Sequence, residues 1–299
     1  MQRQDIREYF SRIGIQRIAE LDTALLEAFG QEEGGRHIER LDELFGHSEE
    51  RLVYGTGDTI YLRRQEELVA YLNQSLQMSL LAASYYDRVF FMRAAEYLVE
   101  HASFFAGDVF DIGCGNGILT CFLASRHPDL AVTGLDLSRE AVCVAERLAE
   151  ELGLRNVRFM RTDENHCRME RITSGRFCNA GQKKAYNGGG ACGTLFSCRT
   201  AHENVAWRPL CEENAAAALT AEEQEQRHRQ YAGILSALLK PQGYLVSVER
   251  YEDDSAYAGL IRALERQGLW QVKGTHTQFS CKCGDGTGTF QTGIFHKTG

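Results

Sequence analysis

The stretch Val109-Phe110-Asp111-Ile112-Gly113-Cys114-Gly115-Asn116-Gly117-Ile118-Leu119-Thr120 decides the fold of this chain. The apolar run ending at Ile112 predicts a buried strand, and residues 118–124 predict the start of a helix. Three glycines at every second position join these elements. Such glycines can adopt positive φ and bring backbone N–H groups against a ligand, and a helix N-terminus favours negative charge. The stretch predicts a ligand-binding loop, although a glycine-rich turn taken alone also fits a purely structural turn.

The residues around the glycines restrict which ligand the loop can bind. A dinucleotide fingerprint needs glycine at position 118, which is Ile118. An acid, Asp111, stands two residues before the first glycine, and this Asp-x-Gly-x-Gly-x-Gly arrangement resembles motif I of the class I S-adenosylmethionine-dependent methyltransferases. The resemblance implies a donor whose ammonium the acid attracts and whose carboxylate accepts loop N–H bonds. It places these loop residues in the cofactor site: Asp111, Gly113, Cys114, Gly115, Asn116 and Gly117.

Two further acids follow at the spacing of that family. Residues 131–136 predict a second strand ending in Asp136, 19 positions after Gly117, where a carboxylate can accept hydrogen bonds from a ribose diol. Leu137 follows it and is assigned to the same site. A third strand over 156–161 leads to Asp163, which by analogy with the family bonds the adenine amino group. Dehydrogenases also carry an acid after their second strand, so Asp136 alone does not distinguish the two families. The glycine loop, Asp136 and Asp163 in this order favour a methyltransferase.

The rest of the chain completes an α/β pattern. Ser138 predicts the N-cap of a helix that Gly153 ends. Further elements are expected over 194–198 (strand), 215–239 (helix), 244–249 (strand), 255–267 (helix), 269–281 (strand) and 287–295 (strand), with a turn at 284–286. We therefore predict a doubly wound, mostly parallel seven-stranded sheet with a terminal antiparallel hairpin.

Residues 1–100 lack strand and helix alternation. Apolar residues at helical spacing predict helices over 6–29, 38–45, 68–81 and 85–102. We expect a helical N-terminal cap region over residues 1–100 and a methyltransferase domain over 101–299. The cap would either cover the mouth of the active site or serve as an appendage that packs on the sheet or on a second copy.

Residues 164–193 follow neither the helix period nor the strand period. One interpretation is an irregular insertion or lid, with Gly188-Gly189-Gly190 as its hinge. The other is that two compensating frame changes make this stretch out of frame, because the family pattern stops at Asp163 and resumes near Leu195.

Two polar residues follow the expected fourth strand. Ligands of doubly wound sheets bind outside the carboxyl ends of the strands, which places His202 and Glu203 near the glycine loop. An imidazole exchanges protons near neutral pH, so His202 is the first candidate for a catalytic base and Glu203 the second. A solvated loop histidine is the alternative. The Asn/Asp-Pro-Pro-Tyr/Phe motif of amino-group methyltransferases is absent, which disfavours adenine and glutamine acceptors.

Composition restricts the partners and the compartment. A net charge of −8 disfavours nucleic-acid substrates. The polar N-terminus and the lack of an apolar run of about 18 residues predict a cytoplasmic protein without a membrane span. The ten cysteines include no C-x-x-C pair, so we expect reduced thiols and no metal site.

The sequence thus predicts an S-adenosylmethionine-dependent methyltransferase with a small-molecule or protein acceptor. Two alternatives stay open. One is a nucleotide-cofactor-dependent oxidoreductase, which Ile118 and the terminal hairpin disfavour. The other is a non-catalytic S-adenosylmethionine-binding or assembly protein, which the irregular stretch 164–193 favours.

Overall fold

The computed structural model describes residues 2–54, 67–161, 192–199, 221–251, 254–283 and 286–298. Its helices are α1 (Gln2–Arg12), α2 (Leu21–Tyr54), α4 (Leu76–Ala82), α5 (Arg88–Glu100), α6 (Ile118–Arg126), α7 (Arg139–Leu152), α9 (Ala221–Leu238) and α10 (Asp254–Arg266). Its strands are β1 (Asp108–Ile112), β2 (Ala131–Asp136), β3 (Val157–Arg161), β4 (Cys192–Arg199), β5 (Leu239–Arg250), β6 (Leu269–Gln271), β7 (Thr277–Cys283) and β8 (Gly286–Lys297). In these ranges no helix combines the length and apolar character that a bilayer crossing requires.

The strands form one sheet in the order β3-β2-β1-β4-β5-β8-β6, with β7 also paired to β8. Strands β3, β2, β1, β4 and β5 run parallel, and β8 runs antiparallel to β5. The expected α/β class with an antiparallel C-terminal end is confirmed. The expected number of seven strands is wrong, because the sheet holds eight in the described part of the chain.

The extra strand arises because the expected strand over 269–281 is interrupted. β6 and β7 lie end to end along the same edge of β8, pairing with residues 295–297 and 286–292 respectively. Between them Val272 N–H donates to the carbonyl of Ile294 at 2.7 Å, and the hydroxyl of Thr275 accepts from Ile294 N–H at 3.1 Å. Gly274, with φ of 82°, lies within this break. The chain thus leaves the ladder and returns to it without losing the hydrogen bonds of β8.

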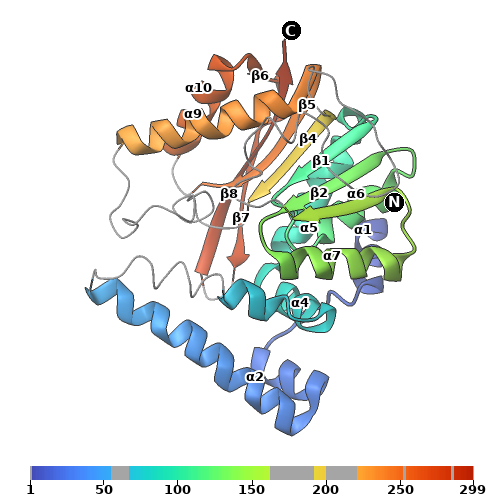
Figure 1. The fold of residues 1–299 in the computed structure, drawn as a ribbon, viewed down its shortest axis with the longest axis vertical. Helices are drawn as coiled ribbons and strands as arrows, with labels where there is room; N and C mark the ends of the chain where they lie inside the picture. Colours follow the sequence, from blue (N-terminus) through green and yellow to red (C-terminus); the bar gives the residue numbers. More distant parts are fainter. Residues whose placement is uncertain are drawn as a thin grey trace.

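Two helical layers cover the sheet, as Figure 1 shows. Neighbouring residues of one strand face opposite layers, since side chains alternate along a strand. Val109 packs in a core with α1, α5, α6 and α7, whereas Phe110 packs in a second core with α9 and α10. Helices α1 and α5 therefore share the core of the sheet, while α2 and α4 lie at one end of it (Figure 1).

Local capping residues explain the bounds of α7. The Ser138 hydroxyl accepts a hydrogen bond from Ala141 N–H at 3.1 Å, and Gly153 ends the helix in the left-handed conformation. Both agree with the expectation from the sequence.

The N-terminal helices differ from the expected ones. The helix expected over 6–29 is two helices, α1 and the start of α2, separated by residues 13–20. Gly30 does not end α2 but bends it sharply, with φ of 79° and ψ of 171°. After the bend the second half of α2 packs closely on the first, since a Cβ built on Gly34 would lie 2.8 Å from the carbonyl oxygen of Leu25. Residues 21–54 therefore form a helical hairpin.

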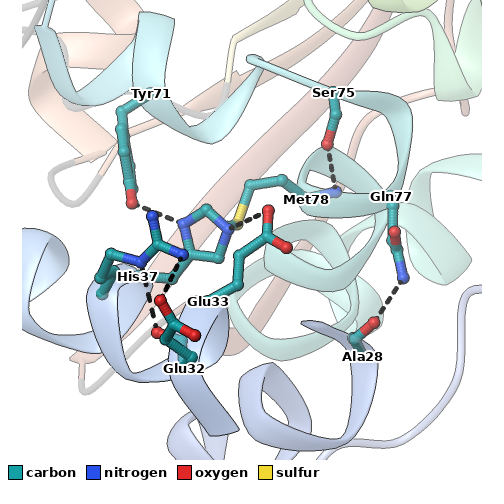
Figure 2. A network of polar contacts seen from close by, with 9 residues as sticks. Ala28, Glu32, Glu33, His37, Tyr71, Ser75, Gln77 and Met78 are labelled. Atoms are coloured by element: carbon teal, nitrogen blue, oxygen red, sulfur yellow. Dashed lines mark hydrogen bonds and ion pairs between the residues drawn. The ribbon is translucent and has the colours of Figure 1, made fainter. Parts of the chain in front are cut away.

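Figure 2 shows the polar contacts that join this hairpin to the start of α4. His37 Nδ1 lies 2.6 Å from the Tyr71 hydroxyl, and His37 Nε2 lies 3.9 Å from a Glu33 oxygen. The Gln77 amide donates to the carbonyl of Ala28 at 3.1 Å. The hairpin is thus fixed to the segment that precedes the sheet.

The helix expected over 68–81 is likewise divided. Residues 67–72 are helical, and Ser75 then starts α4 as its N-cap, accepting from Met78 N–H at 3.1 Å. A π-helical turn over Ala83–Asp87 joins α4 to α5. Such turns interrupt α-helices often at functional sites.

The remaining differences concern boundaries. Strand β4 extends the expected 194–198 at both ends, and β5 begins five residues before the expected 244. The irregular stretch expected over 164–193 is therefore already strand at Cys192. Residues 164–191 lie outside the described part of the chain.

Candidate functional site

The glycine loop leaves β1 at its carboxyl end. Gly113, Gly115 and Gly117 all have positive φ, at 74°, 52° and 75°. The N–H groups of Gly113 and Cys114 both donate to the carbonyl of Leu135, at 2.8 and 3.0 Å. The loop is therefore fixed to β2, and only glycine adopts this series of conformations at no steric cost.

Asp136 fixes the loop from the end of β2. One of its oxygens accepts from Gly115 N–H at 2.8 Å and the other accepts from Ser138 N–H at 2.8 Å. Burial raises the pKa of Asp136, and the hydrogen bonds from Ser138 and Gly115 oppose the rise. The N–H of Leu137 is a third backbone donor to this carboxylate, which leaves part of its acceptor capacity for a ligand. The next residue, Leu137, is 44% exposed and presents an apolar surface beside the carboxylate.

Asp111 lies inside the protein. Its side chain is 1% exposed and accepts a hydrogen bond from the Thr120 hydroxyl at 2.5 Å, between β1 and α6. The pKa of Asp111 is raised to about 7, chiefly by burial; the Thr120 hydrogen bond opposes the rise and the charge of the nearby Asp136 adds to it. The other carboxyl oxygen of Asp111 is buried without a hydrogen-bond partner in the part of the protein that is described. It is a polar atom available to a ligand group of the right chemistry.

Cys114 contributes its backbone to the loop, while its side chain packs beneath it. A Cβ built on Gly134 of β2 would lie 2.9 Å from Cys114 Sγ, so the sulfur fills the space that this glycine leaves. Burial raises the pKa of the thiol well above its ordinary value. The side chain is therefore part of the packing under the loop.

Gly117 allows α6 to approach its neighbours closely. A Cβ there would lie 2.6 Å from the Cβ of Ala145 and 3.0 Å from the ring of Phe159. Ile118, where a dinucleotide fingerprint has its third glycine, is fully buried in the core. Close helix packing here therefore depends on position 117 and leaves no need for glycine at 118.

Ser79 and Tyr9, which the sequence analysis did not single out, connect the N-terminal helices to the glycine loop and to the start of α6. The Asn116 amide donates to the Ser79 hydroxyl of α4 at 3.0 Å. The Tyr9 hydroxyl of α1 donates to the carbonyl of Ile118 at 2.8 Å. No sequence motif marks either residue, since both contacts join segments far apart in the chain.

A second polar group lies at the carboxyl end of β5. Glu249 is fully buried and accepts from the Tyr231 hydroxyl at 3.0 Å and the Ser247 hydroxyl at 3.2 Å. Asp87, at the end of the π-helical turn, has its pKa raised to about 6 by burial, opposed by the charge of Arg250. Asp87 from the N-terminal helices and Arg250 from the sheet therefore interact at the carboxyl end of β5.

The remaining expected site residues, Asp163, His202 and Glu203, lie outside the described residues. Their roles remain predictions.

Comparison with known proteins gives a partial match. Residues 109–177 match the family model described as "Methyltransferase domain". A release factor glutamine methyltransferase of Salmonella typhimurium is 31% identical over 110 residues, 35% of this chain and 40% of the relative. A tRNA (guanine-N(7)-)-methyltransferase of Rubrobacter xylanophilus is 40% identical over 53 residues, 18% of this chain and 24% of the relative. The chain therefore spans less than half the length of these curated relatives.

Among solved structures, magnesium protoporphyrin IX methyltransferase from Synechocystis PCC 6803 with bound S-adenosylmethionine aligns with 95% of this chain and 100% of its own. The identity is 15% and the TM-score is 0.45.

Proposed function

We propose that this chain carries a class I S-adenosylmethionine-dependent methyltransferase domain, and that it is an enzyme that transfers a methyl group from S-adenosylmethionine to an acceptor; the family match over residues 109–177 supports this. The observation that supports this most is the joint geometry of two strand ends. The glycine loop after β1 is hydrogen-bonded through Gly115 N–H to the carboxylate of Asp136 after β2. A Cβ on Gly115 would meet no atom within 4 Å, so the loop has open space beside it.

The residues present suit the proposed cofactor. The remaining acceptor capacity of Asp136 can take hydrogen bonds from the ribose hydroxyls, and the exposed side chain of Leu137 can pack on the adenine. The unpartnered oxygen of Asp111 can accept from the ammonium of the amino-acid end, which would favour the charged form of that carboxyl. We propose Asp163 for the adenine amino group, as the family resemblance implies.

The bound cofactor supplies an electrophilic methyl group on its sulfonium. The protein gains mainly by orienting the acceptor in line with the methyl group and by excluding water. A base is needed only where the acceptor must lose a proton, and we propose His202 or Glu203 for that role. We propose a small molecule or a protein as acceptor, because a net charge of −8 is unfavourable for binding a polyanion.

We propose that the N-terminal helices act as a cap in this enzyme, with residues 1–100 as the cap region and 101–299 as the methyltransferase domain. The hydrogen bond from Asn116 to Ser79 supports a cap that reaches the loop. Helices α1 and α5 and Leu76 of α4 share the core of the sheet, whereas α2 and residues 67–72 pack in a separate core with Met78 and Leu81 of α4. In this proposal α4 therefore joins the outer part of the cap to the domain.

The test is isothermal titration with S-adenosylmethionine. Asparagine tolerates positive φ, so Gly115→Asn should fold, while its side chain enters the open space beside the loop. We expect at least a tenfold loss of affinity. Gly107→Asn is the matched control, because Gly107 also has positive φ, at 64°, and open space at its Cβ, but precedes β1. It should bind as the parent does.

A second variant, Asp136→Asn, tests the proposed ribose contact. Hydrogen bonds to a charged group contribute about 1.5–3 kcal/mol, so we expect a loss of roughly tenfold to a hundredfold. A parent that ignores S-adenosylmethionine but binds a nicotinamide dinucleotide would contradict the proposal and favour an oxidoreductase.

A further inference from the structure

The feature that leads to a further inference is the side chain of Asn116. This residue stands between two positive-φ glycines of the loop, and it reaches away from the loop to α4. Its amide nitrogen lies 3.0 Å from the hydroxyl of Ser79, which is 37 residues earlier in the chain. Ser79 is 2% exposed, so water does not replace this contact readily.

The contact belongs to a chain of hydrogen bonds whose direction is fixed. The amide nitrogen of Asn73 donates to the carbonyl of Val69 at 2.9 Å, and a carbonyl can only accept. The amide oxygen of Asn73 therefore faces Ser79, whose hydroxyl donates to it at 2.9 Å. That hydroxyl must then accept from Asn116. The Asn116 oxygen is left for Ile118 N–H, at 3.5 Å, at the start of α6.

The Ser79 end of this chain is rigid. α4 begins at the N-cap Ser75, and Gln77 on its first turn donates to the carbonyl of Ala28 (Figure 2). Met78, the residue before Ser79, is 1% exposed and packs in one core with Leu25 of the helical hairpin. The hydroxyl of Ser79 is thus held by the N-terminal helices and not by the loop that it contacts.

We propose that Ser79 is a positioning residue for methyl-donor binding, which acts by holding the side chain of Asn116 and thereby the glycine-loop backbone at that residue. The inference rests on the proposed function. It adds that the affinity for S-adenosylmethionine depends on α4 and on the helical hairpin behind it. Because coupling between sites is reciprocal, the bound donor must in turn stabilise α4.

The first experiment measures the affinity of Ser79→Ala for S-adenosylmethionine by titration calorimetry. The substitution leaves the half-buried Asn116 amide without its acceptor, for which we expect about a tenfold weaker affinity. Ser84→Ala is the control. Ser84 is 3% exposed and its hydroxyl also makes two hydrogen bonds, to Leu80 and Gln16, but it does not contact the loop. It should bind within twofold of the parent.

A double-mutant cycle separates positioning from general loss of stability. Asn116→Ala alone should weaken binding, and adding Ser79→Ala to it should cost little more, because the two residues act through one bond. Ser79→Thr keeps the hydroxyl and should restore most of the affinity. Additive losses, or equal losses in Ser79→Ala and Ser84→Ala, would overturn the proposal.

Hydrogen exchange of the parent gives a measurement that needs no variant. Binding of the donor should slow the exchange of the amides of α4, and unchanged exchange there would overturn the inference even if Ser79→Ala fails to fold. A parent that does not bind the donor at all would instead refute the proposed function. A parent that binds it, together with a Ser79→Ala variant of equal affinity, would refute only the role of Ser79.

Discussion

Replacing Asp111 by asparagine should remove a pH-dependent loss in the free energy of unfolding. The folded state raises the pKa of Asp111 from 3.8 to about 7, chiefly by burial. Between these two values the folded protein retains a proton that the unfolded chain has released. The contribution of Asp111 to the free energy of unfolding should therefore be most favourable at pH 4 and below, fall as the pH rises to 7, and stay level above that.

The difference between a pKa of 3.8 in the unfolded chain and about 7 in the folded protein sets the magnitude. A difference of one in pKa corresponds to about 1.4 kcal/mol, so Asp111 can lower the free energy of unfolding by up to about 4 kcal/mol at pH 8. Asp87 and Asp136 also have raised pKa values and act in the same direction. The informative quantity is therefore the difference between the parent and Asp111→Asn at each pH.

The assay is urea unfolding at pH 4.5, 6 and 7.5 without S-adenosylmethionine. Asparagine keeps an acceptor for the Thr120 hydroxyl and does not ionise. The free energy of unfolding of the variant should therefore increase relative to that of the parent as the pH rises. Thr120→Val should act in the opposite sense, because it removes the bond that lowers the pKa of Asp111. A constant difference between Asp111→Asn and the parent across this range would refute the reasoning, since the carboxyl would then ionise without cost.

Two further predictions concern glycines in close contact. Gly34→Ala should lower the free energy of unfolding by about 1–3 kcal/mol, because its Cβ would lie 2.8 Å from the Leu25 carbonyl oxygen. Gly35→Ala, with open space in the same helix, should raise it by about 0.5–1 kcal/mol, and equal thermal midpoints for the two would contradict the hairpin. Gly117→Ala combines positive φ with a Cβ 2.6 Å from that of Ala145 and should cost about 2–5 kcal/mol. Denaturant unfolding checks this value, and a variant as stable as the parent would contradict the packing at the start of α6.

Signals that act over a few residues allowed much of the fold to be predicted. Ser138 and Gly153 bound α7 because capping depends on the backbone beside each residue. The methyltransferase resemblance carried by the glycine loop and Asp136 agrees with the family match, described as "Methyltransferase domain", over residues 109–177. The parallel direction of β1, β2 and β3 could be expected because α6 and α7 separate them in the chain.

What could not be predicted depends on contacts between distant segments. Gly34 lies between the helices expected over 6–29 and 38–45, and its role becomes visible only where the two halves of α2 meet. The bond between Ser79 and Asn116 has no local pattern, since a serine on a helix is ordinary. The bond of Asp111 to Thr120 and the burial of its side chain have no sequence signal either, because they arise from how α6 packs on β1.

The interruption between β6 and β7 has a consequence for how molecules of this protein meet one another. A sheet edge with unpaired backbone groups attracts strands from other molecules and can start aggregation. Here, within residues 254–283, that edge consists of one run of three residues and one of seven, separated by a corner at Gly274. The Trp270 ring, 52% exposed, stands on the shorter run. Along these residues an incoming extended segment meets two short ladders in place of one long one, an arrangement that disfavours edge-to-edge association.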